Sequence, residues 1–359
     1  MASIFNGGIN ISIFGESHGE AIGVVIDNLP AGEKLDIEQI MAFMARRAPK
    51  FGDPSSTQRK EPDIPKIISG YYNGYTTGTP LTCIIENTGQ HSKDYTKMSE
   101  YARPGHADYS GNVRYNGFND IRGGGHFSGR LTAPLVFAGA VAEQILERKG
   151  IYSGAHIYSI SDVKDKPFDD VNISKDDILL IKSKKFPTVD DNAGIKMTEK
   201  VKQAKSNGDS IGGIVECCIV GLPAGVGSPI FDGIENIIAT LIFAVPAIKG
   251  LEFGTGFDTA KMTGSQCNDE MYINNKNEIK SRTNNNGGIL GGISTGMPIL
   301  FKAAVKPTPS ITKTQKTINF KTKENAEISV TGRHDACILP RVVPVIEAVA
   351  NIAVLSLVV

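Results

Sequence analysis

The sequence predicts an α+β fold in which antiparallel sheets and helices are stacked in layers. Short stretches rich in β-branched residues are interleaved with helical segments, without the regular strand-helix-strand order of a parallel, doubly wound sheet. The chain has 359 residues, of which 40% are hydrophobic, so it can bury a large core as one large or two medium domains. Two pairs of similar turn motifs also indicate an internal duplication.

The duplication is inferred from segments that occur twice in the same order. Val25–Gly32 resembles Ile219–Gly225, and Thr77–Pro80 resembles Thr295–Pro298. We therefore expect two pseudo-repeated halves that share a strand-helix-strand unit with insertions. These halves cover about residues 8–150 and 200–355. Chance similarity of turn sequences is the alternative explanation.

Strands are predicted where short β-branched stretches are bounded by turn residues, at 9–14, 22–27, 66–72, 81–86, 211–220 and 298–305. Asp36 is suited to cap a helix that runs to about Arg47 and ends before Pro49, with Gln39 at the reciprocal position of a capping box. A second helix is predicted from Ala133 to about Arg148. Further helices are expected at about 196–206, 229–243 and 341–357.

Three other segments have a distinctive composition. Residues 161–191 and 268–286 are charged or rich in asparagine, with little periodicity, and we expect both to be surface excursions. The stretch from Ala45 to Lys66 has Arg46, Arg47, Lys50, Arg59 and Lys60 among Pro, Gly and Ser, which suits a basic lid over an anionic ligand or an ordinary solvated loop. The apolar C-terminal run is interrupted by Pro344 and Glu347, so we expect a buried helix or a subunit contact rather than a membrane span.

The bulk composition excludes several classes of protein. Thirty-eight basic residues balance thirty-eight acidic ones, so no overall field attracts nucleic acid or an anionic membrane. The five cysteines are odd in number and lack CxxC spacing, which is typical of reduced, buried thiols rather than of disulfides or a zinc site. The N-terminus has neither the basic start nor the apolar core of a secretion signal, and we expect a cytoplasmic protein.

Glycine-rich loops concentrate the chemistry of the chain. The segments Phe14–Gly19, Arg103–Asp108, Gly125–Arg130 and Gly332–Asp335 contain four of the six histidines, and the last three also contain an arginine. Glycine allows a close approach of the backbone to a ligand, arginine binds phosphate or carboxylate, and histidine moves protons near neutral pH. This combination predicts an anion-handling active site. Each loop taken alone is equally compatible with a structural turn.

The arginines also argue against a metal site. Arg103, Arg130 and Arg333 lie next to the histidines and would repel a divalent cation, so we expect no metal. Two later segments, Gly287–Gly292 and Lys306–Ser310, add backbone donors, a lysine and hydroxyl groups. The glycines before Arg130 lead into a helix start, where exposed N–H groups favour phosphate.

Taken together, the motifs resemble those of the chorismate synthase family. The resemblance covers about residues 8–355, and its motifs are Phe14–Gly19, Thr57–Pro62, Arg103–Asp108, Gly288–Ile293, Lys306–Thr308 and Gly332–Asp335. It implies a single domain with a β-α-β sandwich fold, assembled as a homotetramer. It also implies a lyase of the shikimate pathway that converts 5-enolpyruvylshikimate 3-phosphate to chorismate by a 1,4-elimination, with reduced FMN and no net redox change.

The resemblance further implies roles for individual residues. His18 would protonate the departing phosphate, His106 would protonate the reduced flavin, and Asp335, with Ser17 or Ser128, would take part in the flavin proton transfer. The residues implied in substrate binding are Arg46, Arg47, Arg103, Arg130 and Arg333. Those implied in FMN binding are His126, Phe127, Ser128, Ala247, Gly291, Lys306, Pro307, Thr308, Pro309, Ser310 and Arg333, and Arg47 is also a candidate NADP contact.

The chain departs from the family pattern at a few positions. Residues 126–132 read His-Phe-Ser-Gly-Arg-Leu-Thr where many members have Arg-Ser-Ser-Ala-Arg-Glu-Thr, and Pro246 stands where asparagine is usual. No residue decides whether the protein reduces its own flavin with NADPH. Two functions of other classes stay as alternatives, an inactive anion-binding homologue and a flavin-dependent NADPH oxidoreductase.

Overall fold

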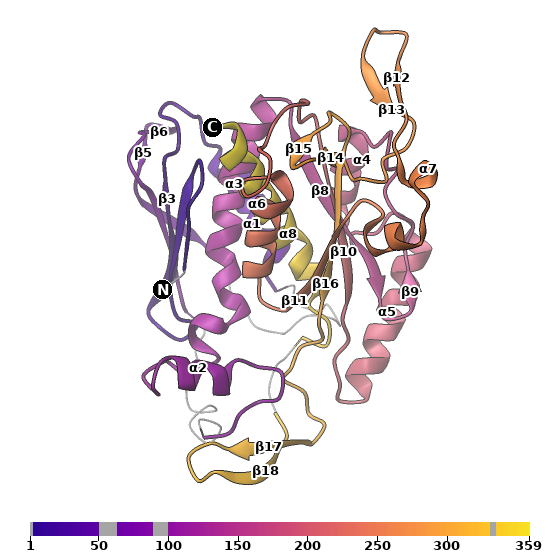
Figure 1. Ribbon diagram of the computed structural model, residues 1–359. Coiled ribbons are helices and arrows are strands. Elements are labelled where there is room, and N and C mark those ends of the chain that lie inside the picture. Colours follow the sequence, from indigo (N-terminus) through magenta and orange to yellow (C-terminus); the bar gives the residue numbers. More distant parts are fainter. Residues whose placement is uncertain (1–2, 50–62, 89–99, 331–334) are drawn as a thin grey trace.

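Two five-stranded antiparallel sheets enclose a layer of helices in the computed structural model, which describes residues 3–49, 63–88, 100–330 and 335–359 (Figure 1). The strand order is β1-β2-β3-β7-β4 in the first sheet and β11-β16-β10-β8-β9 in the second. Every strand pair within these two sheets is antiparallel. The α+β class and the β-α-β sandwich are therefore confirmed.

The strands of the first sheet are β1 (Ile4–Phe5), β2 (Asn10–Gly15), β3 (Ala21–Asp27), β4 (Pro65–Ser69) and β7 (Leu81–Glu86). Those of the second are β8 (Tyr152–Ile160), β9 (Val163–Lys164), β10 (Gly213–Val220), β11 (Ile248–Phe253) and β16 (Ile299–Val305). Four hairpins complete the set: β5 (Tyr71–Tyr72) with β6 (Tyr75–Thr76), β12 (Met271–Ile273) with β13 (Ile279–Ser281), β14 (Ile289–Leu290) with β15 (Ile293–Ser294), and β17 (Gln315–Asn319) with β18 (Glu324–Ile328).

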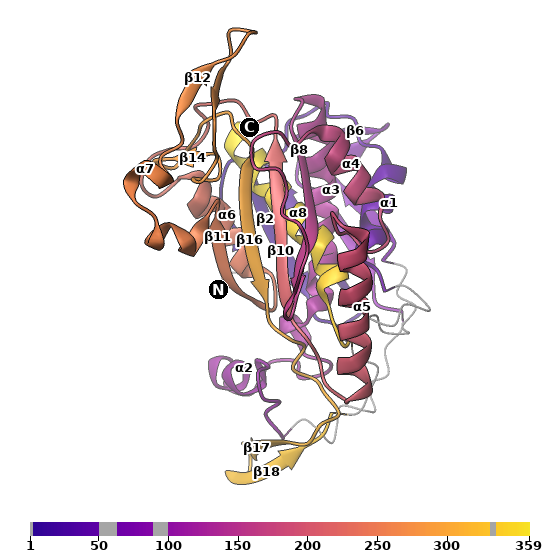
Figure 2. The same ribbon diagram turned by 90° about the vertical axis from the view of Figure 1, so that its right-hand side faces the viewer.

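The inner layer is built on α3 (Thr132–Arg148) and α8 (Leu339–Val358), with α1 (Ile37–Arg47) and α6 (Ile234–Ala244) beside them. Helices α3 and α8 pack closely because Gly139 has no side chain, and a Cβ there would overlap Ala348. On the other side of the second sheet, α4 (Lys175–Ser183) and α5 (Asp191–Ser206) contact β8 (Figure 2). The two short helices are α2 (Asp108–Arg114) and α7 (Gly264–Cys267).

Helix α8 is long and apolar enough to span a membrane by length and composition, but most of it is buried inside the protein. It therefore serves as a core helix, which agrees with the first of the two expectations for the C-terminal run. Its burial within its own chain leaves the second expectation, a subunit contact along this helix, without support.

The start of α1 shows how far local sequence rules hold. The Asp36 side chain accepts hydrogen bonds from the backbone N–H groups of Glu38 and Gln39, as predicted for an N-cap. The Gln39 side chain does not complete the capping box and donates instead to Glu147 on α3. Tertiary contact thus overrides the local pattern at this one position.

The two halves have the same order of elements. The series β2-β3-α1-β4-β7-α3 corresponds to β8-β10-α6-β11-β16-α8, and the sheet order β3-β7-β4 corresponds to β10-β16-β11. The second series begins at β8 (Tyr152–Ile160), so it starts well before the expected bound of about residue 200. The hydroxyls of Thr76 and Ser294 also make the same contacts. Each donates to a proline carbonyl at 2.6 Å, and each accepts a backbone N–H at 2.9 Å. This correspondence supports the proposed duplication more strongly than chance similarity of turns.

The predicted strands and helices are confirmed with shifts of a few residues at their ends.

The interpretation of residues 161–191 as a surface excursion is wrong. This segment forms β9 and α4, and Phe168, Ile173, Ile178 and Ile181 pack in a second hydrophobic cluster. The many charged residues of this segment obscured the helical pattern of α4, because only one face of that helix is apolar and buried. Residues 268–286 do form an exposed excursion, the β12–β13 hairpin, which projects from the body (Figure 1).

Four of the five cysteines are buried, and none forms a disulfide. Burial raises the pKa of the Cys83 thiol to about 12 and also raises the pKa values of Cys217 and Cys218. Because the thiolate is the reactive form, these groups are structural thiols, as the sequence predicted.

Candidate active site

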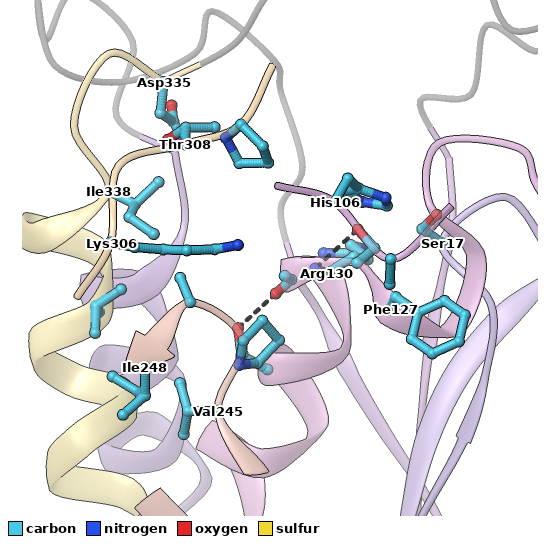
Figure 3. A pocket seen from close by; sticks show the side chains of 18 of the residues that line it. Ser17, His106, Phe127, Arg130, Val245, Ile248, Lys306, Thr308, Asp335 and Ile338 are labelled. Carbon is cyan, nitrogen blue, oxygen red and sulfur yellow. Dashed lines mark hydrogen bonds between the residues drawn. The ribbon is translucent and has the colours of Figure 1, made fainter. Parts of the chain in front are cut away.

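A cavity of about 600 Å³ opens where the two halves meet, and most of the predicted site residues line it (Figure 3). One wall comes from the first half and carries Ser17, His18, Arg103, His106 and the segment from His126 to Arg130. The other wall comes from the second half and carries Val245, Ile248, Lys306, Thr308 and Asp335. The volume lies in the range of small-molecule sites.

His18 lies just beyond the end of β2 and is 7% exposed. Its Nδ1 lies 3.2 Å from Oγ of Ser17, and that hydroxyl can in turn donate to the Arg122 carbonyl at 3.3 Å. The ring fits here because Gly123 has no side chain, since a Cβ at this position would overlap the imidazole. The Ser17 contact and the glycine turn therefore orient His18 at the cavity wall.

His106 forms a dyad with a carboxylate. Its Nδ1 lies 2.6 Å from Oδ1 of Asp108, while Nη2 of Arg103 lies 3.4 Å from its Nε2. Burial alone would raise the pKa of Asp108, but hydrogen bonds from Arg103 and His106 hold it well below its usual range. The ionised Asp108 thus orients His106 in the way that general acid-base catalysis requires.

Arg103 faces the cavity, but Asp108 holds its guanidinium. Nε and Nη2 of Arg103 both lie 2.7 Å from the Asp108 carboxylate in a bidentate pair. Nη2 also approaches the His106 ring at 3.2 Å. The arginine predicted as a substrate ligand is therefore also part of the support of His106.

Arg47 and Arg130 form the most basic part of the wall. Arg47 comes from the end of α1 and Arg130 from the turn before α3, and both are nearly buried. They share the carboxylate of Asp63, which bonds Nη1 of each arginine. The two side chains meet at this buried carboxylate, which does not itself line the cavity.

Asp335 lies just before α8 and pairs with Nη1 of Arg341 at 2.6 Å. Nε of Arg341 donates to the Arg47 carbonyl at 3.1 Å, at the C-terminal end of α1. Arg341 thereby ties the acid of the second half to the segment that carries Arg47. Ser128 also has a local contact, since its Oγ accepts from the Arg130 N–H at the start of a 3-10 turn.

The wall of the second half is largely apolar. Residues Val245 to Ile248, which join α6 to β11, face Ile338 and Val342 at the start of α8. Ala247 has a φ of 76°, a strained conformation for a residue with a side chain, and its carbonyl accepts from the Lys306 N–H at 2.9 Å. The Lys306 side chain extends toward the opposite wall in Figure 3, and its amine contacts the Gly105 carbonyl. Among the described residues, the buried hydroxyl of Thr308 has no hydrogen-bond partner.

The structure brings together fewer site residues than the sequence predicted. Arg46 points away from the cavity to Glu347 on α8, with contacts of 2.5 and 2.8 Å. Gly291 lies in the β14–β15 turn, and Pro307 lies beside Lys306, but neither lines the cavity. Arg333 and the Thr57–Pro62 motif lie outside the described residues, as does most of the Ala45–Lys66 lid.

Sequence reasoning singled out Ala247, which lines the cavity, but no other apolar residue of the second wall. It also did not single out Asp63, Arg341 or Asn87, whose Oδ1 accepts from Nε of Arg130. Asp63 follows the Thr57–Pro62 motif directly, so that extending the motif by one residue would have found it. Arg341 follows Asp335 by six residues in an apolar stretch, where it interrupts the pattern of a buried helix. The apolar wall carries no separate signal, because its residues have the composition of an ordinary core.

Comparison with known proteins gives the same family from sequence and from structure. The sequence model of the chorismate synthase family matches residues 9–359. The chain is 42% identical to the chorismate synthase of Thermococcus kodakarensis over 340 residues, which are 95% of this chain and 93% of the relative. It is 43% identical to that of Dehalococcoides mccartyi over 352 residues, which are 97% of this chain and 94% of the relative.

A crystal structure of a chorismate synthase has a TM-score of 0.74 with this structure at 26% sequence identity, and the match covers 97% of this chain and 91% of the other. The sequence and structural matches extend over nearly the whole chain and include both walls of the cavity. This chain therefore belongs to the chorismate synthase family.

Proposed function

We propose that the cavity converts 5-enolpyruvylshikimate 3-phosphate to chorismate, the shikimate-pathway reaction of the chorismate synthase family. The enzyme is a lyase that acts on a phosphate ester. One observation carries this proposal. One wall of the cavity holds two oriented histidines and an arginine cluster, and the wall that faces it is apolar. The first wall suits a substrate with one phosphate and two carboxylates.

We propose reduced FMN as the cofactor, and the second wall fits it. The apolar residues from Val245 to Ile248 suit a flavin ring, while the amine of Lys306 and the hydroxyl of Thr308, which has no partner among the described residues, offer polar contacts. His126, Phe127, Pro309 and Ser310 also line the cavity as candidate FMN contacts. When bound, reduced FMN supplies the transient electron that helps the phosphate leave.

The roles of the chain's own residues follow from their positions. His18 protonates the departing phosphate, with Ser17 holding its ring, while Arg47 and Arg130 bind anionic groups of the substrate. His106, oriented by Asp108, would hold a proton beside the bound flavin and supply it there. Asp335, held by Arg341, takes part in that proton transfer from the opposite wall, with Ser17 or Ser128.

We further propose a cytoplasmic homotetramer, with NADPH as a candidate reductant of FMN and Arg47 as a candidate NADP contact. Support for assembly comes from large apolar side chains on the surface. Ile230, Phe231 and Phe257 are at least 74% exposed, and Ile273 and Ile279 at 69 and 70% lie on the projecting hairpin. Exposed apolar side chains of this size are typical of subunit contacts.

The reaction is tested with purified protein, the enolpyruvyl substrate and chemically reduced FMN without oxygen. We expect chorismate to form, followed by its ultraviolet absorbance. Steady NADPH oxidation that needs no shikimate compound would instead identify an unrelated flavin oxidoreductase. Absence of chorismate with intact, flavin-bound protein would contradict the proposed function.

The role of His106 is tested by replacement with alanine. We expect the rate of chorismate formation to fall about a hundredfold or more, because a positioned proton donor is lost. FMN binding, measured by flavin fluorescence, should change little. A variant with full activity would remove the assigned role.

A further inference from the structure

The carboxylate of Asp63 lies behind the arginine cluster and not in the cavity. Its side chain is 1% exposed, and it is absent from the residues that line the cavity, whereas Arg47 and Arg130 both line it. Oδ2 of Asp63 is 2.5 Å from Nη1 of Arg47, and Oδ1 accepts from Nη1 of Arg130. One carboxylate thus holds two cavity arginines from the side away from the ligand.

Asp63 is the contact that fixes the two guanidinium groups relative to each other. Arg47 has two further acceptors at 3.1 Å, the hydroxyl of Thr132 and the carbonyl of Gly129. Arg130 has a different one, Oδ1 of Asn87 at 3.1 Å. Of the hydrogen bonds described here, only those to Asp63 are shared by both side chains.

The charges explain why the shared partner is needed. Two buried guanidinium groups side by side repel each other strongly where water is excluded. Burial raises the pKa of the Asp63 carboxyl, but Arg47 and Arg130 outweigh burial and hold it below its ordinary value. The carboxylate therefore stays ionised beside the two guanidinium groups, and both of these arginines line the cavity.

We propose that Asp63 is a positioning residue, which aims Arg47 and Arg130 at one anionic group of the substrate without contacting the substrate itself. This inference rests on the proposed function, because it concerns the binding of 5-enolpyruvylshikimate 3-phosphate. A carboxylate that occupied the ligand's own place would have to line the cavity and be displaced on binding. Asp63 does not line the cavity, and it is buried against both arginines.

The substitution Asp63→Asn tests the proposal with little change in shape. Asp63 has a φ of 48°, and asparagine tolerates this left-handed conformation better than other residues with a side chain. The amide keeps one acceptor oxygen but turns an NH2 group toward the second guanidinium, so that one arginine loses its charged contact with residue 63. A matched control is Asp162→Asn, which removes an exposed carboxylate paired with Lys200.

We expect Asp63→Asn to raise the KM for the substrate at least tenfold, about the effect of one charged hydrogen bond, with a smaller change in kcat. Asp162→Asn should leave both constants unchanged. A KM within twofold of the wild type, or a lower KM, would overturn the proposal. The KM change separates positioning from a general loss of structure, which would lower the thermal midpoint and the amount of active enzyme together.

A second pair of variants covers failure of Asp63→Asn to fold. In the Arg130→Gln protein, a glutamine oxygen can accept from the new amide, so that adding Asp63→Asn should change KM by less than about threefold. A further tenfold loss in that background would contradict the proposal.

Calorimetric titration with inorganic phosphate separates this inference from the proposed reaction. If wild-type protein makes no chorismate but Asp63→Asn still weakens phosphate binding tenfold, the reaction fails and the positioning role stands. If phosphate binds equally to both proteins, the positioning role fails whatever the reaction.

Discussion

Two adjacent glycines determine where both histidines of the site lie. Gly123 has a φ of 63°, and a Cβ there would overlap the His18 ring. Gly124 has a φ of 112°, and a Cβ there would lie 3.1 Å from Nε2 of His106. One turn with left-handed backbone thus receives two imidazoles from distant segments, and only glycine allows both contacts.

Replacement of Gly123 by alanine should therefore act on catalysis through His18. We expect chorismate formation to fall about a hundredfold, the typical effect of a lost general acid, because the methyl group displaces the ring. The matched control is Gly117→Ala, which has a similar φ of 78° but meets only the Asn112 amide at 3.7 Å. Equal activity of the two variants in the chorismate assay would contradict this role of Gly123.

The two arginines at the end of α1 show what the sequence could and could not predict at this scale. Arg46 and Arg47 were both expected at the substrate. Neighbours on a helix point about 100° apart, so only one of them can face the cavity. Arg47 faces the cavity, while Arg46 pairs with Glu347. Burial lowers the pKa of Arg46, but Glu347 outweighs burial and raises it above its ordinary value.

Among the elements, the connection between β8 and β10 is held by a buried charge cluster. His156 on β8 is fully buried, with Nδ1 3.0 Å from Asp165 and Nε2 2.8 Å from Glu216 on β10. Asp165 also accepts from the backbone N–H groups of Val189 and Asp190, so that it ties both ends of the 161–191 segment to the sheet. The sequence did not predict this, because the charge pattern carries no sign of which partners become buried.

This cluster predicts a pH dependence of stability. Burial lowers the pKa of His156, but Asp165 and Glu216 outweigh burial and raise it above its ordinary value. A raised pKa in the folded state means that the protonated ring stabilises the fold fully below about pH 6.5, its unfolded value, and that this contribution is lost as pH rises through the folded pKa.

The variant His156→Gln should be less stable than the wild type by about 3–5 kcal/mol near pH 6, the usual cost of breaking a buried ion pair. The difference should shrink toward alkaline pH, where the wild type loses its own proton. Urea unfolding at several pH values measures this difference. A difference that is constant or grows with pH would show that His156 is neutral in the folded protein.

Across the whole molecule, the two halves keep the same elements but have different chemistry. The turns with Thr76 and Ser294 have equivalent hydrogen bonds, and they belong to the β5–β6 and β14–β15 hairpins at one end of the molecule (Figure 1). The equivalent connections from β7 to α3 and from β16 to α8 instead contribute different residues to the cavity. The first half contributes histidines and arginines, and the second half contributes the apolar wall with Lys306 and Thr308. If the halves arose by duplication, as we propose, function was acquired by divergence of loops on a shared scaffold.

The sequence predicted the polar loops and most helices, because glycine-rich motifs and the spacing of apolar residues can be recognised within a short stretch of chain. The polar loops were identifiable from glycine beside histidine and arginine, and the helices from their caps and apolar faces. Strands β8 and β11 were not predicted, since β8 carries a buried polar histidine and β11 is short and half-buried. The apolar wall could not be distinguished from core until the chain was folded.

The meeting of two ligands between these walls is tested most directly by a crystal structure with 5-enolpyruvylshikimate 3-phosphate and FMN bound together. We expect the flavin ring against Val245 to Ile248 and the anionic groups of the substrate at Arg47 and Arg130, with His18 beside the phosphate oxygen. Density for either ligand outside this cavity, or a substrate phosphate remote from both His18 and the arginine cluster, would contradict the account.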